Sequence, residues 1–341
     1  MLKVGIVGIG FMGWIHWLAY QKNPKVTVVA VSDTDHNKLT GDWTSIQGNF
    51  GPPGEHVDLS DIATYSRASD LLNDTSVDIV DICLPPALHA DLTIKALQSG
   101  KHVFCEKPMA LQLTDCDRML EAARSANKQL MIGHVLPFFP EYQMARDTIA
   151  SGEFGRLLGG HFKRVIADPI WLQGFYDPNR VGGPLIDLHV HDAHFIRMLF
   201  GMPKSIKAVG RRRGEVVQYC ASLFEYESSE FVVSSIMGTI DQQGRGFTHG
   251  FEIHLEDATL HFEFAGFQDR QETMPFKIVK RDGTIERNSL SGGDPIGPFH
   301  AEIAEVINSI QTGKTSPILD GLLARDALEM CIWQDQVIAK K

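Results

Sequence analysis

The sequence predicts an α/β fold class: an N-terminal doubly wound parallel sheet, then a C-terminal α+β domain with a large, open, mostly antiparallel sheet. Over roughly the first 135 of the 341 residues, runs of Val, Ile and Leu alternate with helical patterns. Between Ser205 and Lys280 the pattern becomes one of alternating strands. A chain of this length is also long for one hydrophobic core. We therefore expect domains at residues 1–136 and 137–341, with C-terminal helices able to pack back on the first domain.

Five apolar runs predict the strands of the N-terminal sheet: Leu2–Val7, Val26–Ser32, Val77–Leu84, His102–Cys105 and Gln129–Gly133. Amphipathic stretches predict the connecting helices, one around Leu88–Leu97 and one around Met119–Ala126. We expect a capping box at Thr114 and Asp117 to open the second helix. The stretch Asn37–His56, rich in Gly and Pro, predicts a partly irregular insertion.

After Pro140 the sequence predicts a helix, a strand and a long loop before a second helix over Leu185–Phe200. The loop runs from Asp168 to Pro184 and is rich in Pro and aromatic residues. Strict alternation then predicts an antiparallel sheet with one face buried and one face free. Two helices over His300–Gln311 and Leu322–Ala339 close the chain.

The composition limits the classes of partner and compartment. A formal net charge of −10 argues against nucleic acid, because phosphate backbones need concentrated Lys and Arg. The basic run Arg211–Arg213 is interpreted as a solvated or intersubunit edge. Five cysteines without a Cys-x-x-Cys pair indicate reduced thiols, and no apolar run reaches the roughly 18 residues of a membrane helix. We expect a soluble, cytoplasmic protein.

A G-x-G-x-x-G motif, formed by Gly8, Gly10 and Gly13 with Phe11 and Met12 between the last two glycines, follows the first predicted strand and precedes a helical pattern. The first glycine allows a tight turn, the second lets a pyrophosphate approach the backbone, and the third permits close helix packing. The free N–H groups at the helix start attract phosphate.

The next predicted strand ends at Asp33, 20 residues after Gly13. A carboxylate there accepts hydrogen bonds from ribose hydroxyls and repels a 2′-phosphate, and no Arg follows immediately. The motif therefore predicts a Rossmann domain that binds NAD in preference to NADP. A glycine turn without any nucleotide is the alternative.

Glu106 and Lys107 follow the strand His102–Cys105, at the strand end where open α/β sheets bind ligands. Lys107 could there bond the reacting oxygen and stabilise its developing negative charge. The alternative is a surface ion pair with Glu106.

A second cluster of polar residues lies between Gly182 and His194. If this stretch is one helix from Leu185, then Asp187, His191 and His194 share a face. Asp187 would orient His191 and raise its pKa toward neutrality, as a general base requires. A divalent-metal site and a purely structural cluster are the alternatives, and we predict no metal.

In this order, the glycine motif, Glu106-Lys107-Pro108 and Gly182-Gly183-x3-Asp187-x3-His191 resemble the glucose–fructose oxidoreductase / inositol dehydrogenase / MocA (Gfo/Idh/MocA) family over essentially the whole chain. The resemblance implies an oligomeric NAD-dependent dehydrogenase, a homodimer or homotetramer, acting on a sugar-like substrate in a cleft between two domains. It implies Lys107, Asp187 and His191 as catalytic residues. The implied cofactor contacts are Gly8, Gly10, Phe11, Met12, Gly13, Asp33, Leu84, Pro85, His89, Glu106 and Lys107.

The implied substrate contacts are Lys107, His134, Trp171, Arg180, Asp187, His191 and His194, with Phe175 in the same loop as Trp171. Two positions depart from the family pattern: His134 and its neighbours replace a polar or basic pair, and His194 stands where an Asp is usual. These departures bear on the substrate more than on the reaction class. The expected reaction is hydride transfer between NAD and a hydroxyl or carbonyl carbon of a sugar, cyclitol or sugar derivative. An NAD-dependent glycosidase acting by transient oxidation and elimination, and a non-catalytic NAD-binding sensor, are the alternatives.

Overall fold

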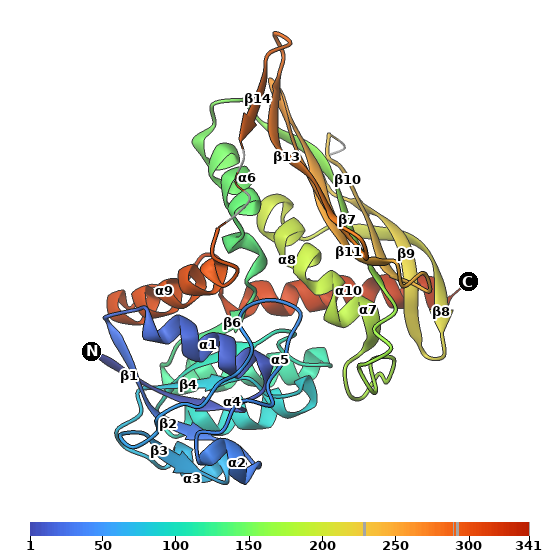
Figure 1. The fold of residues 1–341 in the computed structure, drawn as a ribbon. Helices are drawn as coiled ribbons and strands as arrows, with labels where there is room; N and C mark the ends of the chain where they lie inside the picture. The colour runs from blue at the N-terminus through green and yellow to red at the C-terminus, as the bar shows by residue number, and fades with distance from the viewer. Residues whose placement is uncertain (228–229, 289, 291–292, 341) are drawn as a thin grey trace. The chain divides into compact units, whose positions relative to one another are not determined.

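The computed structural model describes residues 1–227, 230–288, 290 and 293–340 (Figure 1). The chain forms two compact units. Unit 1 comprises Met1–Phe138 and Asp294–Arg325, and unit 2 comprises the described residues of Phe139–Gly293 and Asp326–Lys341. Among the described residues, no helix is both long enough and apolar enough to cross a membrane. All five cysteines are unbridged.

Unit 1, every residue of which is described, contains a six-stranded sheet in the order β3-β2-β1-β4-β5-β6, with all pairs parallel. The order reverses between β1 and β4, and such a switch point is where open α/β sheets bind their ligands. This confirms the predicted doubly wound sheet and adds β3, which the sequence analysis did not predict. The strands are β1 (Leu2–Val7), β2 (Val26–Ser32), β3 (Ala63–Tyr65), β4 (Ile79–Ile82), β5 (His102–Glu106) and β6 (Leu130–Gly133).

The helices of unit 1 cover this sheet, and α9, from the C-terminal third of the chain, packs against α1 (Figure 1). The predicted capping box is wrong. Helix α5 begins at Leu113 after an extended Gln112, so Thr114 already lies inside the first turn and cannot be the cap. The helices are α1 (Phe11–Gln21), α2 (His36–Leu39), α3 (Ala68–Leu72), η1 (Pro86–Leu88), α4 (His89–Gln98), α5 (Leu113–Ala126), η2 (Leu136–Phe138) and α9 (Gly297–Thr312).

The insertion over residues 37–56 is largely irregular, as predicted, but it is part of the core. Trp43 is fully buried and packs edge-on against Trp14 and Trp17 of α1. The indole N–H of Trp14 donates to the carbonyl of Pro52 at 3.0 Å. The insertion therefore packs against helix α1, at whose N-terminus the glycine motif lies.

Within the described part of unit 2, an eight-stranded sheet has the order β14-β13-β12-β11-β7-β10-β9-β8. Its pairs are antiparallel except β7 with β10, which confirms the mostly antiparallel sheet. The strands are β7 (Leu157–Ala167), β8 (Ser205–Arg213), β9 (Val216–Glu225), β10 (Val232–Ile240), β11 (Arg245–Leu255), β12 (Ala258–Phe267), β13 (Gln271–Lys280) and β14 (Ile285–Asn288). Helix α6 (Pro140–Ser151) precedes β7, and α10 (Gly321–Ala339) crosses the unit boundary after Arg325.

The helix predicted over Leu185–Phe200 is two helices. Helix α7 (Gly183–Asp187) ends before Leu188, and α8 (His189–Phe200) begins after it. Gly182 and Gly183 have φ values of +87° and +75°, which only glycine adopts easily, so they set the sharp entry into α7. Asp187 and His191 therefore lie on successive helices rather than on one continuous face.

Candidate active site

The glycine motif has the geometry of a phosphate-binding turn. Gly8 has a φ of +93°, and a Cβ on Gly13 would lie 2.1 Å from the carbonyl oxygen of Gly8, so neither position tolerates a side chain. A Cβ on Gly10 would meet nothing within 4 Å. Open space beside the N-terminus of α1 is what a pyrophosphate needs, and the residues present fit a dinucleotide.

Asp33 joins the end of β2 to the glycine motif. Its Oδ2 accepts the backbone N–H of Ile9 at 2.7 Å, and its Oδ1 accepts that of Asp35 at 2.8 Å. A carboxylate has about four lone-pair sites, so two remain for ribose hydroxyls. The Nζ of Lys38 lies 3.7 Å from Oδ2, a cation that the sequence analysis did not place near Asp33.

The predicted cofactor residues differ in how they are placed. Phe11 packs its ring edge-on against Phe50, with the two ring centres 4.7 Å apart. Leu84 is half-buried and Pro85 is exposed. His89 is fully buried, with ring nitrogens 2.7 Å from the carbonyl of Leu84 and 2.9 Å from that of Pro108. Burial lowers the pKa of His89, and a neutral ring has one N–H, so it donates to only one of these carbonyls at a time. Its cofactor contact stays a prediction.

Glu106 ends strand β5, and its carboxylate folds back on the next residue. Its Oε2 accepts the backbone N–H of Lys107 at 3.0 Å. Its Oε1 faces Nε2 of His16 at 3.2 Å. Glu106 is 6% exposed, and Lys107 is half-buried.

His134, a predicted substrate contact, is fully buried just after β6 in unit 1. The remaining predicted residues lie in unit 2. Asp187 and His191 are half-buried, and His194 is fully buried. Trp171 and Arg180 are exposed on the loop after β7, whereas Phe175 in the same loop is 2% exposed. Lys107 and the Asp187–His191 pair belong to different units, and their common action remains a prediction.

A buried ion pair that the sequence analysis missed fixes helix α8. The Nε of Arg164 donates to Oδ2 of Asp192 at 2.6 Å, and its Nη2 donates to Oδ1 at 3.1 Å. The two side chains are 5% and 2% exposed. Asp192 is the neighbour of His191 on α8, so this pair sets the rotation of the helix that carries the predicted base. An Arg on a strand and an Asp on a helix, 28 residues apart, leave no local pattern.

The basic run Arg211–Arg213 is more than a solvated edge. Arg212 pairs with Asp335 at 2.7 Å, and Arg213 pairs with Asp168 at 2.6 Å. The Arg213 guanidinium also lies 4.2 Å from the ring centre of Tyr176, whose hydroxyl donates to Asp168 at 2.7 Å. These contacts anchor the base of the loop that carries Trp171.

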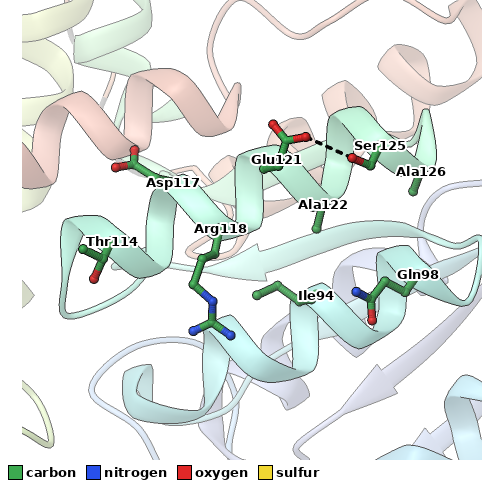
Figure 2. A pocket seen from close by; sticks show the side chains of 9 residues that line it. All are labelled: Ile94, Gln98, Thr114, Asp117, Arg118, Glu121, Ala122, Ser125 and Ala126. Carbon is green, nitrogen blue, oxygen red and sulfur yellow. Dashed lines mark hydrogen bonds between the residues drawn. The ribbon is translucent and has the colours of Figure 1, made fainter.

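Two other features carry less chemistry. Figure 2 shows a groove between α4 and α5 of unit 1, and no residue of the predicted site lines it. Its Arg118 pairs with Asp115 at 2.8 Å, and Ser125 donates to Glu121 at 3.0 Å. In the described part of the chain, His16, Asp81 and Cys83 have atoms close enough to hold a metal ion together. Nδ1 of His16 lies 2.9 Å from Asp81 and 3.4 Å from Cys83, which are the distances of the hydrogen bonds between them.

Several known proteins are similar to this chain. Among curated relatives, the 1,5-anhydro-D-fructose reductase of Ensifer adhaerens is 36% identical over 246 residues, covering 71% of this chain and 66% of that protein. The myo-inositol 2-dehydrogenase of Thermotoga maritima is 28% identical over 202 residues, covering 59% and 55%. The 2,7-anhydro-N-acetylneuraminate hydratase of Escherichia coli is 29% identical over 215 residues, covering 62% and 53%. The matches thus span between about half and two thirds of these relatives.

Solved structures share the fold along the whole chain. An oxidoreductase from Agrobacterium radiobacter, in complex with NAD+, L-tartaric acid and magnesium, gives a TM-score of 0.82 at 17% identity, covering 99% of this chain and 96% of that one. Levoglucosan dehydrogenase in complex with NADH and levoglucosan gives 0.78 at 21% identity, covering 99% and 97%.

Two sequence profiles of one family match successive parts of the chain. The profile described as an oxidoreductase family with an NAD-binding Rossmann fold matches residues 2–134. The profile of the family's C-terminal domain matches residues 142–261. The chain therefore belongs to the Gfo/Idh/MocA family of oxidoreductases, as the ordered motifs indicated.

Proposed function

We propose that this protein is an NAD-dependent oxidoreductase that transfers a hydride between the nicotinamide and a hydroxyl or carbonyl carbon of a sugar, cyclitol or sugar derivative. The observation that carries the proposal is the tie between Asp33 and the glycine motif. The 2.7 Å hydrogen bond from Ile9 holds the carboxylate beside the N-terminus of α1, where ribose and pyrophosphate would both be bound.

We propose NAD as the preferred cofactor because Asp33 carries a negative charge where NADP has its 2′-phosphate. Lys38, 3.7 Å from Asp33, offsets part of that charge. We therefore expect the preference for NAD to be a ratio of affinities, with NADP still bound. The ratio of the two dissociation constants, measured on the same preparation, tests it.

The dinucleotide, when bound, supplies the hydride acceptor or donor. The chain's own residues handle the proton and the charge. In alcohol oxidation, His191 takes the hydroxyl proton with its ring oriented by Asp187, and Lys107 stabilises the developing alkoxide. His134, Trp171, Arg180 and His194 are the proposed substrate contacts.

The relatives suggest which sugars to test first. The panel is 1,5-anhydro-D-fructose, myo-inositol, levoglucosan and 2,7-anhydro-N-acetylneuraminate, each with NAD and NADP in both redox states. Absorbance of the reduced nicotinamide is the readout. Lys107→Ala and His191→Ala should each lose on the order of 100-fold or more in rate.

Lys25→Ala is the matched control, because Lys25 is an exposed lysine of the same unit as Lys107. It precedes β2, so it lies at the amino ends of the parallel strands, away from their carboxyl ends where Lys107 lies. It should keep the wild-type rate. Wild-type turnover by His191→Ala or Lys107→Ala would refute the assignment of roles. Tight NAD binding without turnover of any sugar would favour the sensor.

A second function is favoured by one relative, which is named a hydratase rather than a dehydrogenase. An enzyme that oxidises a sugar transiently, eliminates a substituent and reduces the product consumes no net NAD. Such an enzyme would convert a panel sugar without accumulating NADH, which chromatography of the sugar detects.

We also propose self-association, as a homodimer or homotetramer. Four apolar side chains stand exposed on one face of the unit 2 sheet: Val209, Leu223, Val232 and Ile236. An exposed apolar sheet face indicates an association surface. Light scattering coupled to size exclusion measures the mass, and a monomer at micromolar concentration would refute this part.

A further inference from the structure

Behind the loop that carries Lys107 lies a buried group of ionisable side chains from four elements of unit 1. His16 and Tyr20 come from α1, Asp81 from β4, Glu106 from β5 and Glu302 from α9. All five are 6% exposed or less. None of them except Glu106 has a part in the proposed function, and burying so many ionisable groups is unfavourable unless they stabilise one another.

The contacts form a line that ends at the backbone of Lys107. Asp81 Oδ2 lies 2.9 Å from Nδ1 of His16. Nε2 of His16 lies 3.2 Å from Oε1 of Glu106, an ion-pair contact without the alignment of a hydrogen bond. Oε2 of Glu106 then accepts the N–H of Lys107 at 3.0 Å. The imidazole thus lies between the side chains of Asp81 and Glu106, and Glu106 accepts the backbone N–H of Lys107, the predicted catalytic residue.

The charges favour this arrangement. Burial lowers the pKa of His16, but the negative charge of Asp81 and the side-chain hydrogen bonds to Asp81 and Cys83 outweigh this effect, so the pKa of His16 lies well above its ordinary value. Burial raises the pKa of Glu302 far above its usual range, and neither of its oxygens has a hydrogen-bond partner among the described residues. Burial also raises the pKa values of Tyr20 and Cys83. The protonated form of His16 is thus favoured where its ring lies between the side chains of Asp81 and Glu106.

The carboxylate of Glu106 has little room on its other side. A Cβ built on Gly133 of β6 would lie 3.2 Å from Oε1, so a side chain at this position would crowd the carboxylate, which glycine does not. His89 meanwhile holds Pro108 by a 2.9 Å contact to its carbonyl. Two buried histidines from different helices thus fix the residues on either side of Lys107.

We propose that His16 is a positioning residue that acts through Glu106: it holds the carboxylate on the N–H of Lys107 and so fixes where the ammonium group is presented. This inference rests on the proposed role of Lys107. Without the imidazole, Oε1 loses its cationic neighbour and the carboxylate can turn away from the Lys107 amide. A misplacement of about 1 Å in a catalytic group can lower the rate by about 100-fold.

Two substitutions, each of which retains one of the two nitrogen positions of the histidine ring, test its contacts with Asp81 and Glu106 separately. His16→Asn keeps an amide nitrogen where Nδ1 faces Asp81 and leaves nothing toward Glu106. His16→Gln places its amide nitrogen where Nε2 faces Glu106. We expect kcat to fall about 10- to 100-fold in the Asn variant and clearly less in the Gln variant, with KM for the sugar within about twofold in both. Trp17→Phe is the matched control, because Trp17 is a buried neighbour on α1 that packs on Trp43.

The nuclear magnetic resonance signal of the Lys107 amide tests this inference independently of the proposed function, because it can be measured without a substrate. The amide proton of Lys107 should resonate downfield in the wild type and in His16→Gln, and should move upfield in His16→Asn. This result stands even if no sugar in the panel is a substrate. An unchanged Lys107 amide in the Asn variant, equal losses in Asn and Gln, or a loss of kcat that Trp17→Phe reproduces at the same Tm would each overturn the inference.

Discussion

Replacing Asp192 by Asn tests whether the buried ion pair with Arg164 fixes helix α8. The pair is bidentate, at 2.6 and 3.1 Å, and almost completely buried. The substitution leaves the Arg164 guanidinium buried without a counter-charge, which destabilises a protein by about 3–5 kcal/mol. Because Asn retains one oxygen as acceptor, we expect about 3 kcal/mol.

That loss corresponds to a Tm lowered by roughly 6–12 °C for a unit of this size, measured by calorimetry or circular dichroism. The double variant Arg164→Met/Asp192→Leu should lose less than Asp192→Asn, since it removes both charges together. The control is Asp70→Asn, which breaks an Arg67–Asp70 pair whose side chains are 74% and 37% exposed, and should change stability by less than about 1 kcal/mol. An Asp192→Asn protein as stable as the wild type would refute the reasoning, as would a double variant that loses as much stability as Asp192→Asn or more.

Three further predictions follow from buried positions. Gly13→Ala should destabilise unit 1 and abolish NAD binding, because its Cβ would collide with the carbonyl of Gly8. Gly10→Ala should keep the wild-type Tm and lower the affinity for NAD, measured by titration. Equal losses of Tm in the two variants would contradict this prediction. Burial raises the pKa of Glu302, so the stability that its protonated form contributes is present at acid pH and is lost as the pH rises through the pKa of the folded protein. Glu302→Gln should therefore match the wild-type Tm at low pH and exceed it at alkaline pH. A Tm below the wild type at alkaline pH would contradict the assignment. Burial lowers the pKa of His189 to about 4, so the stability that its neutral ring contributes is present above the ordinary pKa. About 3 kcal/mol of this stability is lost as the pH falls from about 6.5 to 4. His189→Gln should flatten the dependence of Tm on pH between these values, and an unchanged slope would contradict the prediction.

Local sequence patterns predicted most of the elements and the candidate residues of the cofactor site. Repeated apolar runs and amphipathic stretches specify strands and helices because burial requires a periodicity of two or of 3.6 residues. The glycine motif and Asp33 could be identified because a pyrophosphate imposes a backbone requirement at fixed spacing. Lys107 followed from its place at the end of a strand. The helix break at Leu188 escaped prediction, because apolar and polar spacing continues across it.

Only the tertiary structure decided which polar groups meet. His16 and Asp81 are 65 residues apart in the chain, and Arg164 and Asp192 are 28 apart, yet each pair is buried at hydrogen-bond distance. The burial of Trp43 in the irregular insertion, and of Phe175 in the loop that carries Trp171, is equally a matter of packing. Periodicity records which side of an element faces the core. It does not record which ionisable group of another element becomes its partner, because the partner is determined by how the layers pack and not by neighbours along the chain.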